Sequence, residues 1–129
     1  YIGGMGQFGY FCPSPLGGLD YTCLSDSLPS TVSVGIIWNI LSDKNRICFQ
    51  SDRRFFCLEN GKISQIDVFS DIYSSLVVRN KFYMTSSKGL MILNGTEFIP
   101  VDNTSDIGST VKTGGLLSYQ DKLIVVSCL

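Results

Sequence analysis

The chain has 129 residues, a net charge of −1 and 44% hydrophobic residues, values typical of one globular domain. The ten basic residues are scattered along the sequence, which argues against nucleic-acid binding by this segment. No apolar run approaches the roughly 18 to 20 residues of a membrane-spanning helix. Histidine is absent, which excludes Ser-His-Asp catalysis and His-ligated metal sites from this chain.

Residues 1–29 predict the last three strands of a four-stranded antiparallel unit, whose strands we label a to d. The glycines near Gly6 formally match G-x-G-x-x-G, but Pro13 and Pro15 follow too soon for a helix to begin there. We therefore expect these glycines to relieve crowding in a hairpin. Residues 25–35, rich in Ser and Thr, are expected to cross to the next unit.

Residues 36–67 predict a complete unit, with four short apolar runs separated by three polar turns. Asn60-Gly61 is a strong hairpin signal, because a type I′ turn needs positive φ at both central residues. Trp38, the only tryptophan, lies in the innermost strand of this unit. We expect its ring to pack between neighbouring units; the alternative is that it lines the central channel.

This unit recurs along the chain. Residues 82–93 align without a gap on residues 47–58, a shift of 35 residues (82 − 47). Residues 73–102 predict a second complete unit, residues 102–111 a polar crossing, and residues 112–129 the first two strands of another unit. A period of about 35 to 45 residues with four strands is typical of β-propeller blades.

The sequence therefore predicts an all-β fold, a partial β-propeller made of four-stranded antiparallel blades. Two blades are complete (36–67 and 73–102) and two are partial (1–29 and 112–129). The pattern is already in progress at both ends of the sequence, so we expect a fragment of one propeller domain.

The five cysteines, Cys12, Cys23, Cys48, Cys57 and Cys128, have no CxxC spacing, which argues against zinc. We expect them to be buried thiols that act as small apolar residues. The alternative for Cys48 and Cys57 is a disulfide across their predicted hairpin, although directly opposed strand cysteines seldom bridge. No cofactor is expected.

The repeats resemble a known family. Its pattern, Ile-Trp-Ile-Gly-Thr-Asp-Asp-Gly-Leu-Tyr-Arg-Tyr followed by Asn-Gly, is that of the two-component regulator propeller repeat. Residues 82–93 are similar to it and keep a glycine at Gly89, whereas residues 47–58 carry Cys48, Gln50 and Arg54 at its Trp and Gly positions. The opening residues resemble the sensor propellers of the subgroup with helix-turn-helix output.

The resemblance implies a periplasmic sensor propeller of Bacteroidetes-type hybrid two-component systems or of related membrane regulators. Such a segment is expected to lie on the periplasmic side of the inner membrane, in a membrane-anchored protein, and to bind a glycan-derived ligand without catalysing a reaction. Two alternatives stay open: a noncatalytic scaffold that binds another protein, and a fragment of a propeller polysaccharide lyase or glycosidase.

Topology indicates where a ligand would bind. In an up-and-down blade the b–c loops and the d–a crossings share one face, and binding residues usually lie on loops held by a rigid scaffold. The predicted ligand-binding residues are Gln7, Asp52, Arg53, Arg54 and Lys88. The expected partners are an oligosaccharide and either the remaining blades of the same receptor or a second copy of the chain, because open blade faces and edges favour association.

Overall fold

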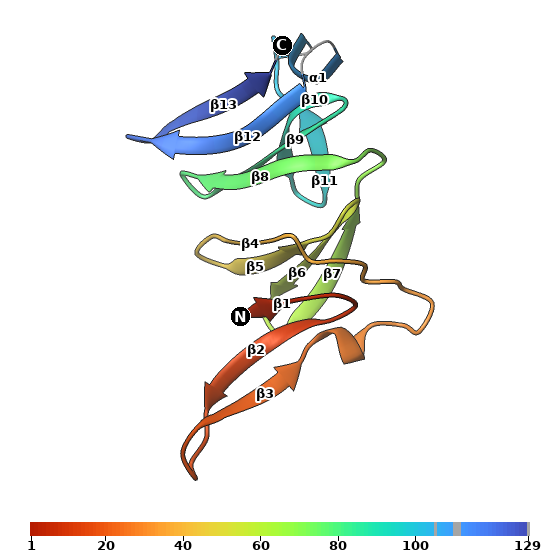
Figure 1. Cartoon of the computed structure of the whole chain (residues 1–129), viewed down its shortest axis with the longest axis vertical. Coiled ribbons are helices and arrows are strands. Elements are labelled where there is room, and N and C mark those ends of the chain that lie inside the picture. The colour runs from red at the N-terminus through yellow and green to blue at the C-terminus, as the bar shows by residue number, and fades with distance from the viewer. Residues whose placement is uncertain (105, 110–111, 129) are drawn as a thin grey trace.

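The computed structural model describes residues 1–104, 106–109 and 112–128, and its strands form four antiparallel sheets. We number them sheets 1 to 4 in chain order. Figure 1 shows them following one another along the long axis of the molecule. Neighbouring strands in each sheet are consecutive in the sequence. The prediction of an all-β fold built from antiparallel sheets is therefore confirmed.

The first two sheets match the first two predicted units. Sheet 1 contains β1 (Ile2–Gly3), β2 (Phe8–Pro13) and β3 (Leu19–Cys23). Sheet 2 contains β4 (Asn39–Ser42), β5 (Arg46–Gln50), β6 (Arg54–Glu59) and β7 (Lys62–Asp67). Strand β4 begins three residues later than the predicted start of its unit at Ile36, and Ile36 itself makes an isolated bridge with Met5 of the first loop.

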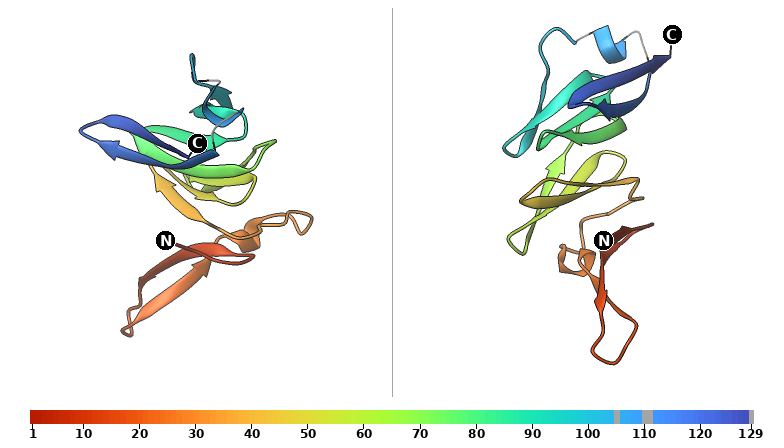
Figure 2. Two further views of the ribbon diagram at one scale, coloured as in Figure 1. Left: turned by 45° about the horizontal axis from the view of Figure 1, so that its top comes forward. Right: turned by 90° about the vertical axis from the view of Figure 1, so that its left-hand side faces the viewer.

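The last two sheets match the remaining units, and Figure 2 shows them at the C-terminal end of the molecule. Sheet 3 contains β8 (Ile72–Val78), β9 (Lys81–Ser86), β10 (Gly89–Asn94) and β11 (Glu97–Pro100). Sheet 4 contains β12 (Lys112–Tyr119) and β13 (Lys122–Cys128).

The crossings contain short helices that the sequence analysis treated as loop. A 3₁₀ helix covers Ser25–Ser27, and the α-helix α1 covers Asp106–Ser109 in the predicted polar crossing of residues 102–111. Residues 105, 110 and 111 of that crossing lie outside the described residues. Within the part of the chain that the structure describes, no helix is long and apolar enough to cross a membrane.

The hairpin turns explain why the repeat is not uniform. Asn60 and Gly61 both have positive φ, and Glu59 pairs with Lys62, as the Asn-Gly signal predicts. In the next sheet Asn94 instead pairs with Glu97, so only Gly95 of its Asn-Gly dipeptide is a central turn residue. The two dipeptides are therefore offset by one position in otherwise equivalent hairpins.

Two hydrophobic clusters hold the sheets together. Phe49 and Phe56 of sheet 2 pack with Phe8 of sheet 1, and the Phe8 and Phe49 rings stack with centroids 4.4 Å apart. Alternate residues of the same two strands point to the other face. There Phe55 and Cys48 pack in a second cluster whose further members are Leu41, Cys57, Ile66, Val68, Phe82, Met84 and Met91. Sheet 2 is thus buried on both faces.

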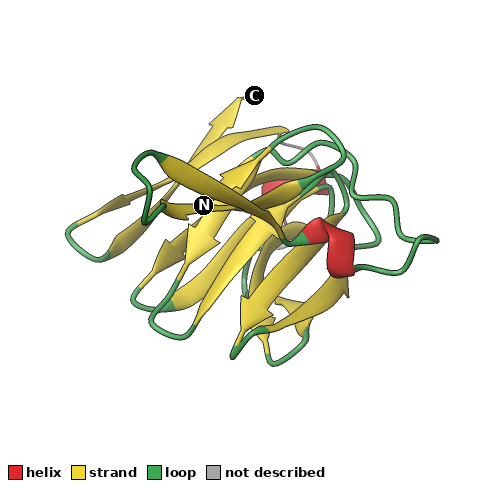
Figure 3. Cartoon of the chain, turned by 90° about the horizontal axis from the view of Figure 1, so that it is seen from below, coloured by secondary structure: helices red, strands yellow, loops and turns green. Residues whose placement is uncertain are grey.

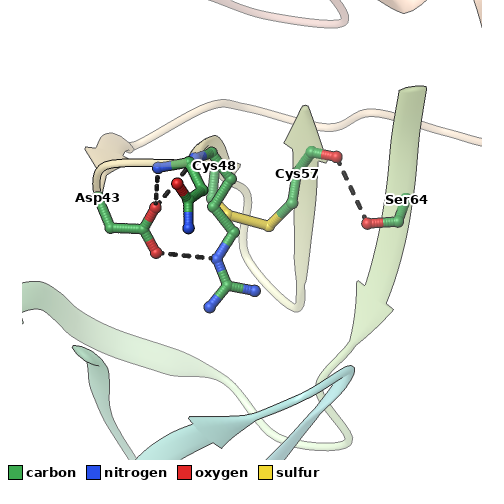
Figure 4. Close-up of a disulfide and its surroundings, with 6 residues drawn as sticks. Asp43, Cys48, Cys57 and Ser64 are labelled. Carbon is green, nitrogen blue, oxygen red and sulfur yellow. Dashed lines mark hydrogen bonds and ion pairs between the residues drawn. A yellow bond between two sulfur atoms is a disulfide. The ribbon is translucent and has the colours of Figure 1, made fainter. Parts of the chain in front are cut away.

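The cysteines differ from the expectation of buried free thiols. Cys48 and Cys57 lie opposite each other in β5 and β6, with Cα atoms 4.0 Å apart, and form a buried disulfide (Figure 4). Cys12 is exposed and Cys23 is half-buried, and both are free. The side chain of Cys128 lies outside the described residues. The register of β5 and β6 places both thiols directly opposite each other on the same face.

Glycines in these sheets permit close contacts between segments. A Cβ on Gly9 would lie 2.1 Å from the carbonyl oxygen of Thr22, so the expected relief of crowding holds for Gly9. It is wrong for Gly4 and Gly6, where no atom would lie within 4 Å of an added Cβ. Gly89 has φ +102°, and a Cβ there would lie 2.8 Å from the carbonyl oxygen of Ile107 in α1. Gly89 is therefore required both by its own backbone and by the helix that packs over β10.

A comparison of Gly89→Ala with Gly61→Ala should separate the cost of the positive φ from the cost of the close contact with α1. Gly61→Ala meets only the positive φ penalty, because no atom would lie within 4 Å of the added Cβ. We expect Gly61→Ala to cost about 1 kcal/mol of unfolding free energy and Gly89→Ala about 2 to 3 kcal/mol. Urea unfolding of both variants measures the difference, and equal costs would show that α1 does not constrain Gly89.

Loss of the disulfide should destabilise the fold without removing it. We expect the double variant Cys48→Ala, Cys57→Ala to lose about 3 kcal/mol, since the bond closes a short loop and fills a buried site. Thermal unfolding measures this loss. The matched control is Cys12→Ala, an exposed free thiol whose removal should leave the unfolding temperature unchanged. A double variant as stable as the control would contradict this account.

Candidate functional site

The loops and crossings of successive sheets meet along one side of the molecule. The N–H of Gly6 donates to the carbonyl of Gly35 (2.7 Å), and the N–H of Val68 donates to the carbonyl of Arg53 (2.8 Å). Each bond joins a b–c loop to the crossing between its own sheet and the next. In Figure 3 the long crossings lie on the right and several hairpin turns on the left. We call this side the crossing edge; it contains residues 4–7, 33–38, 51–54, 67–73 and 87–88.

Asp52 is the central residue of the crossing edge. Its Oδ1 accepts a hydrogen bond from Nε1 of Trp38 (2.5 Å), and its backbone carbonyl accepts one from the N–H of Ile72 (3.1 Å). Asp52 therefore connects the start of sheet 2 to the start of sheet 3.

The expectation that Trp38 packs between units is wrong, because its side chain is 63% exposed. The strand pairing explains this position. Asn39 is the first residue of β4 and pairs with Gln50, so Trp38 lies just before the strand, beside the loop that carries Asp52, and not within the stacked faces. Trp38 is the candidate site residue that the sequence reasoning missed. No local pattern in the sequence signalled its exposure, because this depends on the pairing of Asn39 with Gln50.

Arg53 lies next to this pair and extends the polar surface. Its Nε donates to Oδ1 of Asp71 (2.7 Å), and both side chains are more than half exposed. An exposed ion pair of this kind contributes little to stability, because water screens both charges. The guanidinium and the carboxylate remain accessible to a ligand.

Arg54, by contrast, is held by contacts to other parts of the fold. Its Nε donates to Oδ1 of Asp67 (2.5 Å), its Nη1 donates to the carbonyl of Ser33 (3.2 Å), and its guanidinium lies over the Phe56 ring. The hydrogen bond from Arg54 lowers the pKa of Asp67, and Gln65 contributes a second, smaller lowering. Arg54 thus joins sheet 2 to the crossing that precedes it.

The remaining two predicted residues line separate hollows. Gln7 lines a groove of about 380 Å³ on sheet 1, whose other lining residues are Ile2, Gly3, Gly4, Phe11 and Tyr21. Lys88 lines a hollow of about 150 Å³ between sheets 2 and 3, together with Asp67, Phe69 and Glu97. The structure therefore brings Asp52, Arg53 and Arg54 together with Trp38 and Asp71, while Gln7 and Lys88 flank this group along the crossing edge.

A buried polar network supports the group from beneath. The hydroxyl of Ser75 in β8 donates to Oε1 of Gln50 in β5, and Nδ2 of Asn39 in β4 donates to the Ser75 carbonyl oxygen (3.1 Å). Buried polar groups that satisfy one another in this way fix the relative position of the elements that carry them. The network therefore holds the first strands of sheets 2 and 3 together directly behind the crossing edge.

Among the described residues, no group of three or more His, Cys, Asp or Glu side chains is arranged to hold a metal ion. The polar groups of the site are instead carboxylates and guanidinium groups beside an exposed indole ring. This arrangement can bind a ligand by ring stacking and by hydrogen bonds in both directions.

No family model, curated protein or solved structure matches the chain.

Removal of Arg54 should lower stability in a pH-dependent way. The pKa of Asp67 is lowered in the folded state, so the contribution of the ionised pair is present above the unfolded pKa, near 4, and is lost as the pH falls through the folded value. Because the Asp67 carboxylate is half-exposed and water screens the pair, we expect Arg54→Ala to cost only about 1 kcal/mol at pH 7 and less below about pH 4.

Urea unfolding of Arg54→Ala and of wild type across this pH range measures the effect. Arg53→Ala is the matched control, since its more exposed ion pair should change stability by less than about 0.5 kcal/mol. A cost for Arg54→Ala that is independent of pH would contradict the role assigned to Asp67.

Proposed function

We propose that this chain is part of an extracytoplasmic β-propeller that senses a ligand for a membrane signal-transduction receptor, a two-component or one-component regulator. The observation that carries the proposal is the group of Trp38, Asp52, Arg53 and Asp71 on the crossing edge. In a sensor, the scaffold supplies rigidity and the loops supply recognition. The segment itself is noncatalytic in this proposal.

The arrangement of the sheets supports a propeller. The first strands of the last three sheets, β4, β8 and β12, contact one another in order. The N–H of Leu116 in β12 also donates to the hydroxyl of Ser74 in β8 (3.0 Å). In a propeller the innermost strands of successive blades are neighbours around the axis, which is the relation that these three strands show pairwise.

The chemistry of the site supports a glycan-derived ligand. Sugars combine apolar ring faces with hydroxyl groups that both donate and accept hydrogen bonds. Trp38 offers an apolar surface, Asp52 and Asp71 offer acceptors, and the guanidinium of Arg53 offers planar donors.

The disulfide supports the proposed location on the periplasmic side of the membrane. Disulfides persist in oxidising compartments such as the bacterial periplasm and are rare in the cytosol. The bond between Cys48 and Cys57 is buried between sheets 2 and 3, where it stabilises the fold, so it fits a protein that matures outside the cytoplasm.

The outer sheets support association with further blades or with a second copy of the chain. Phe11 and Tyr21 on sheet 1 and Leu117 and Ile124 on sheet 4 are exposed apolar side chains. In the proposed propeller these faces pack against neighbouring blades, as both faces of sheet 2 do within this chain.

Oligosaccharide binding by the purified chain tests the proposed function. We expect Arg53→Ala to weaken binding about tenfold, because the site loses its exposed donor group. The control is Arg79→Ala. Arg79 forms an equally exposed pair with Asp121, 3.7 Å away, in turns outside the crossing edge. Isothermal titration against pooled plant and mucin oligosaccharides measures both variants. Equal weakening by the two substitutions, or none, would contradict the assignment of the site.

A further inference from the structure

The first strands of sheets 3 and 4 share one irregularity. The pairing of β8 with β9 shifts register between Ile72 and Ser74, and the pairing of β12 with β13 shifts between Thr113 and Gly115. The extra residues are Tyr73 and Gly114. They are 41 positions apart, the same distance that separates Lys81 from Lys122 at the start of the next strands. A bulge therefore recurs at the same place in sheets 3 and 4.

Sheet 2 has a related contact at Trp38, the residue before β4. The N–H of Trp38 donates to the carbonyl of Gln50 (2.9 Å), and Gln50 pairs with Asn39. Trp38 and Tyr73 are 35 positions apart, the shift that relates the two repeats (82 − 47). Bulges commonly redirect a side chain away from the regular alternation of a strand. The bulge residue Tyr73 and its equivalent Trp38 are both aromatic.

Both aromatic side chains are accessible. Trp38 is 63% exposed and Tyr73 is 44% exposed. Asp52 links the two positions, because its carboxylate binds the Trp38 indole and its carbonyl binds the N–H of Ile72, the residue before Tyr73. The one polar atom of the indole is thus already hydrogen-bonded to Asp52, so Trp38 offers an apolar ring to a ligand. The network of Asn39, Gln50 and Ser75 holds the two strands together beneath it.

We propose that Trp38 and Tyr73 form an aromatic track that stacks on sugar rings of one oligosaccharide lying across sheets 2 and 3. The proposal rests on the proposed function and names the residues that bind the chain of sugars. Asp52, Asp71 and the Arg53 that pairs with Asp71 border the track, and their net negative charge gives no attraction for a nucleic acid or another polyphosphate. A neutral oligosaccharide fits both the aromatic rings and the carboxylates, because its ring faces stack on the aromatic side chains and its hydroxyls donate to the carboxylates.

The test is isothermal titration of the purified chain with neutral glucan, xylan and mannan series, from monosaccharides to longer oligomers. We expect affinity to increase with oligomer length, and Trp38→Ala and Tyr73→Ala each to weaken binding of the longer oligomers about tenfold. Tyr119→Ala is the matched control. Tyr119 is a 62% exposed aromatic residue at the end of β12 and outside the crossing edge, so its removal should leave affinity unchanged.

Trp38→Phe adds a second check, since it keeps an aromatic ring but removes the Nε1 donor to Asp52. We expect it to retain more affinity than Trp38→Ala. Oligosaccharide binding that survives both alanine substitutions would overturn the track and leave the proposed function standing. Binding of a proline-rich peptide, with no oligosaccharide bound by the wild-type chain, would overturn both.

Discussion

The burial of sheet 2 on both faces is the constraint on which the rest of the structure depends. Phe49 and Phe56 pack toward sheet 1, whereas Cys48, Phe55 and Cys57 pack toward sheet 3. A strand pair whose two faces are both apolar must have a neighbouring sheet on each side, because exposing either face would leave large side chains in water. This requirement stacks the sheets in chain order. The disulfide lies in the apolar interface between sheets 2 and 3 and strengthens it.

Stacking in chain order determines where function can lie. When consecutive up-and-down sheets pack face to face, their b–c loops and crossings meet on one side, and here backbone hydrogen bonds join the loops of sheets 1 and 2 to the crossings that follow them. The crossing edge is consequently a continuous surface drawn from separate repeats. Its rigidity comes from buried groups behind it, the Gln50, Ser75 and Asn39 network in particular, and its chemistry comes from exposed Trp38, Asp52 and Arg53.

Local patterns were sufficient to predict the strands, the sheet order and most turns. Period-two alternation defined β9 from Lys81 to Ser86, and Asn60-Gly61 defined a hairpin, because both depend on residues close in sequence. The exposure of Trp38 and the structural role of Arg54 could not be predicted in this way. Each depends on a partner in another segment: Asp52 for the indole, and Asp67 with Ser33 for the guanidinium. The one-position offset of Asn94 could not be predicted, because the sequence Asn-Gly is the same whether it occupies both central turn positions or begins one residue earlier.

The central claim is that the indole of Trp38, held by Asp52, is the surface on which a saccharide binds. Because the chain has a single tryptophan, its indole N–H gives one side-chain signal in a ¹H–¹⁵N spectrum. The account predicts that this proton exchanges slowly with water in the free protein and that its signal shifts progressively as oligosaccharide is added, with no such response in Asp52→Ala. An indole signal that stays unchanged while the oligosaccharide binds would contradict the account.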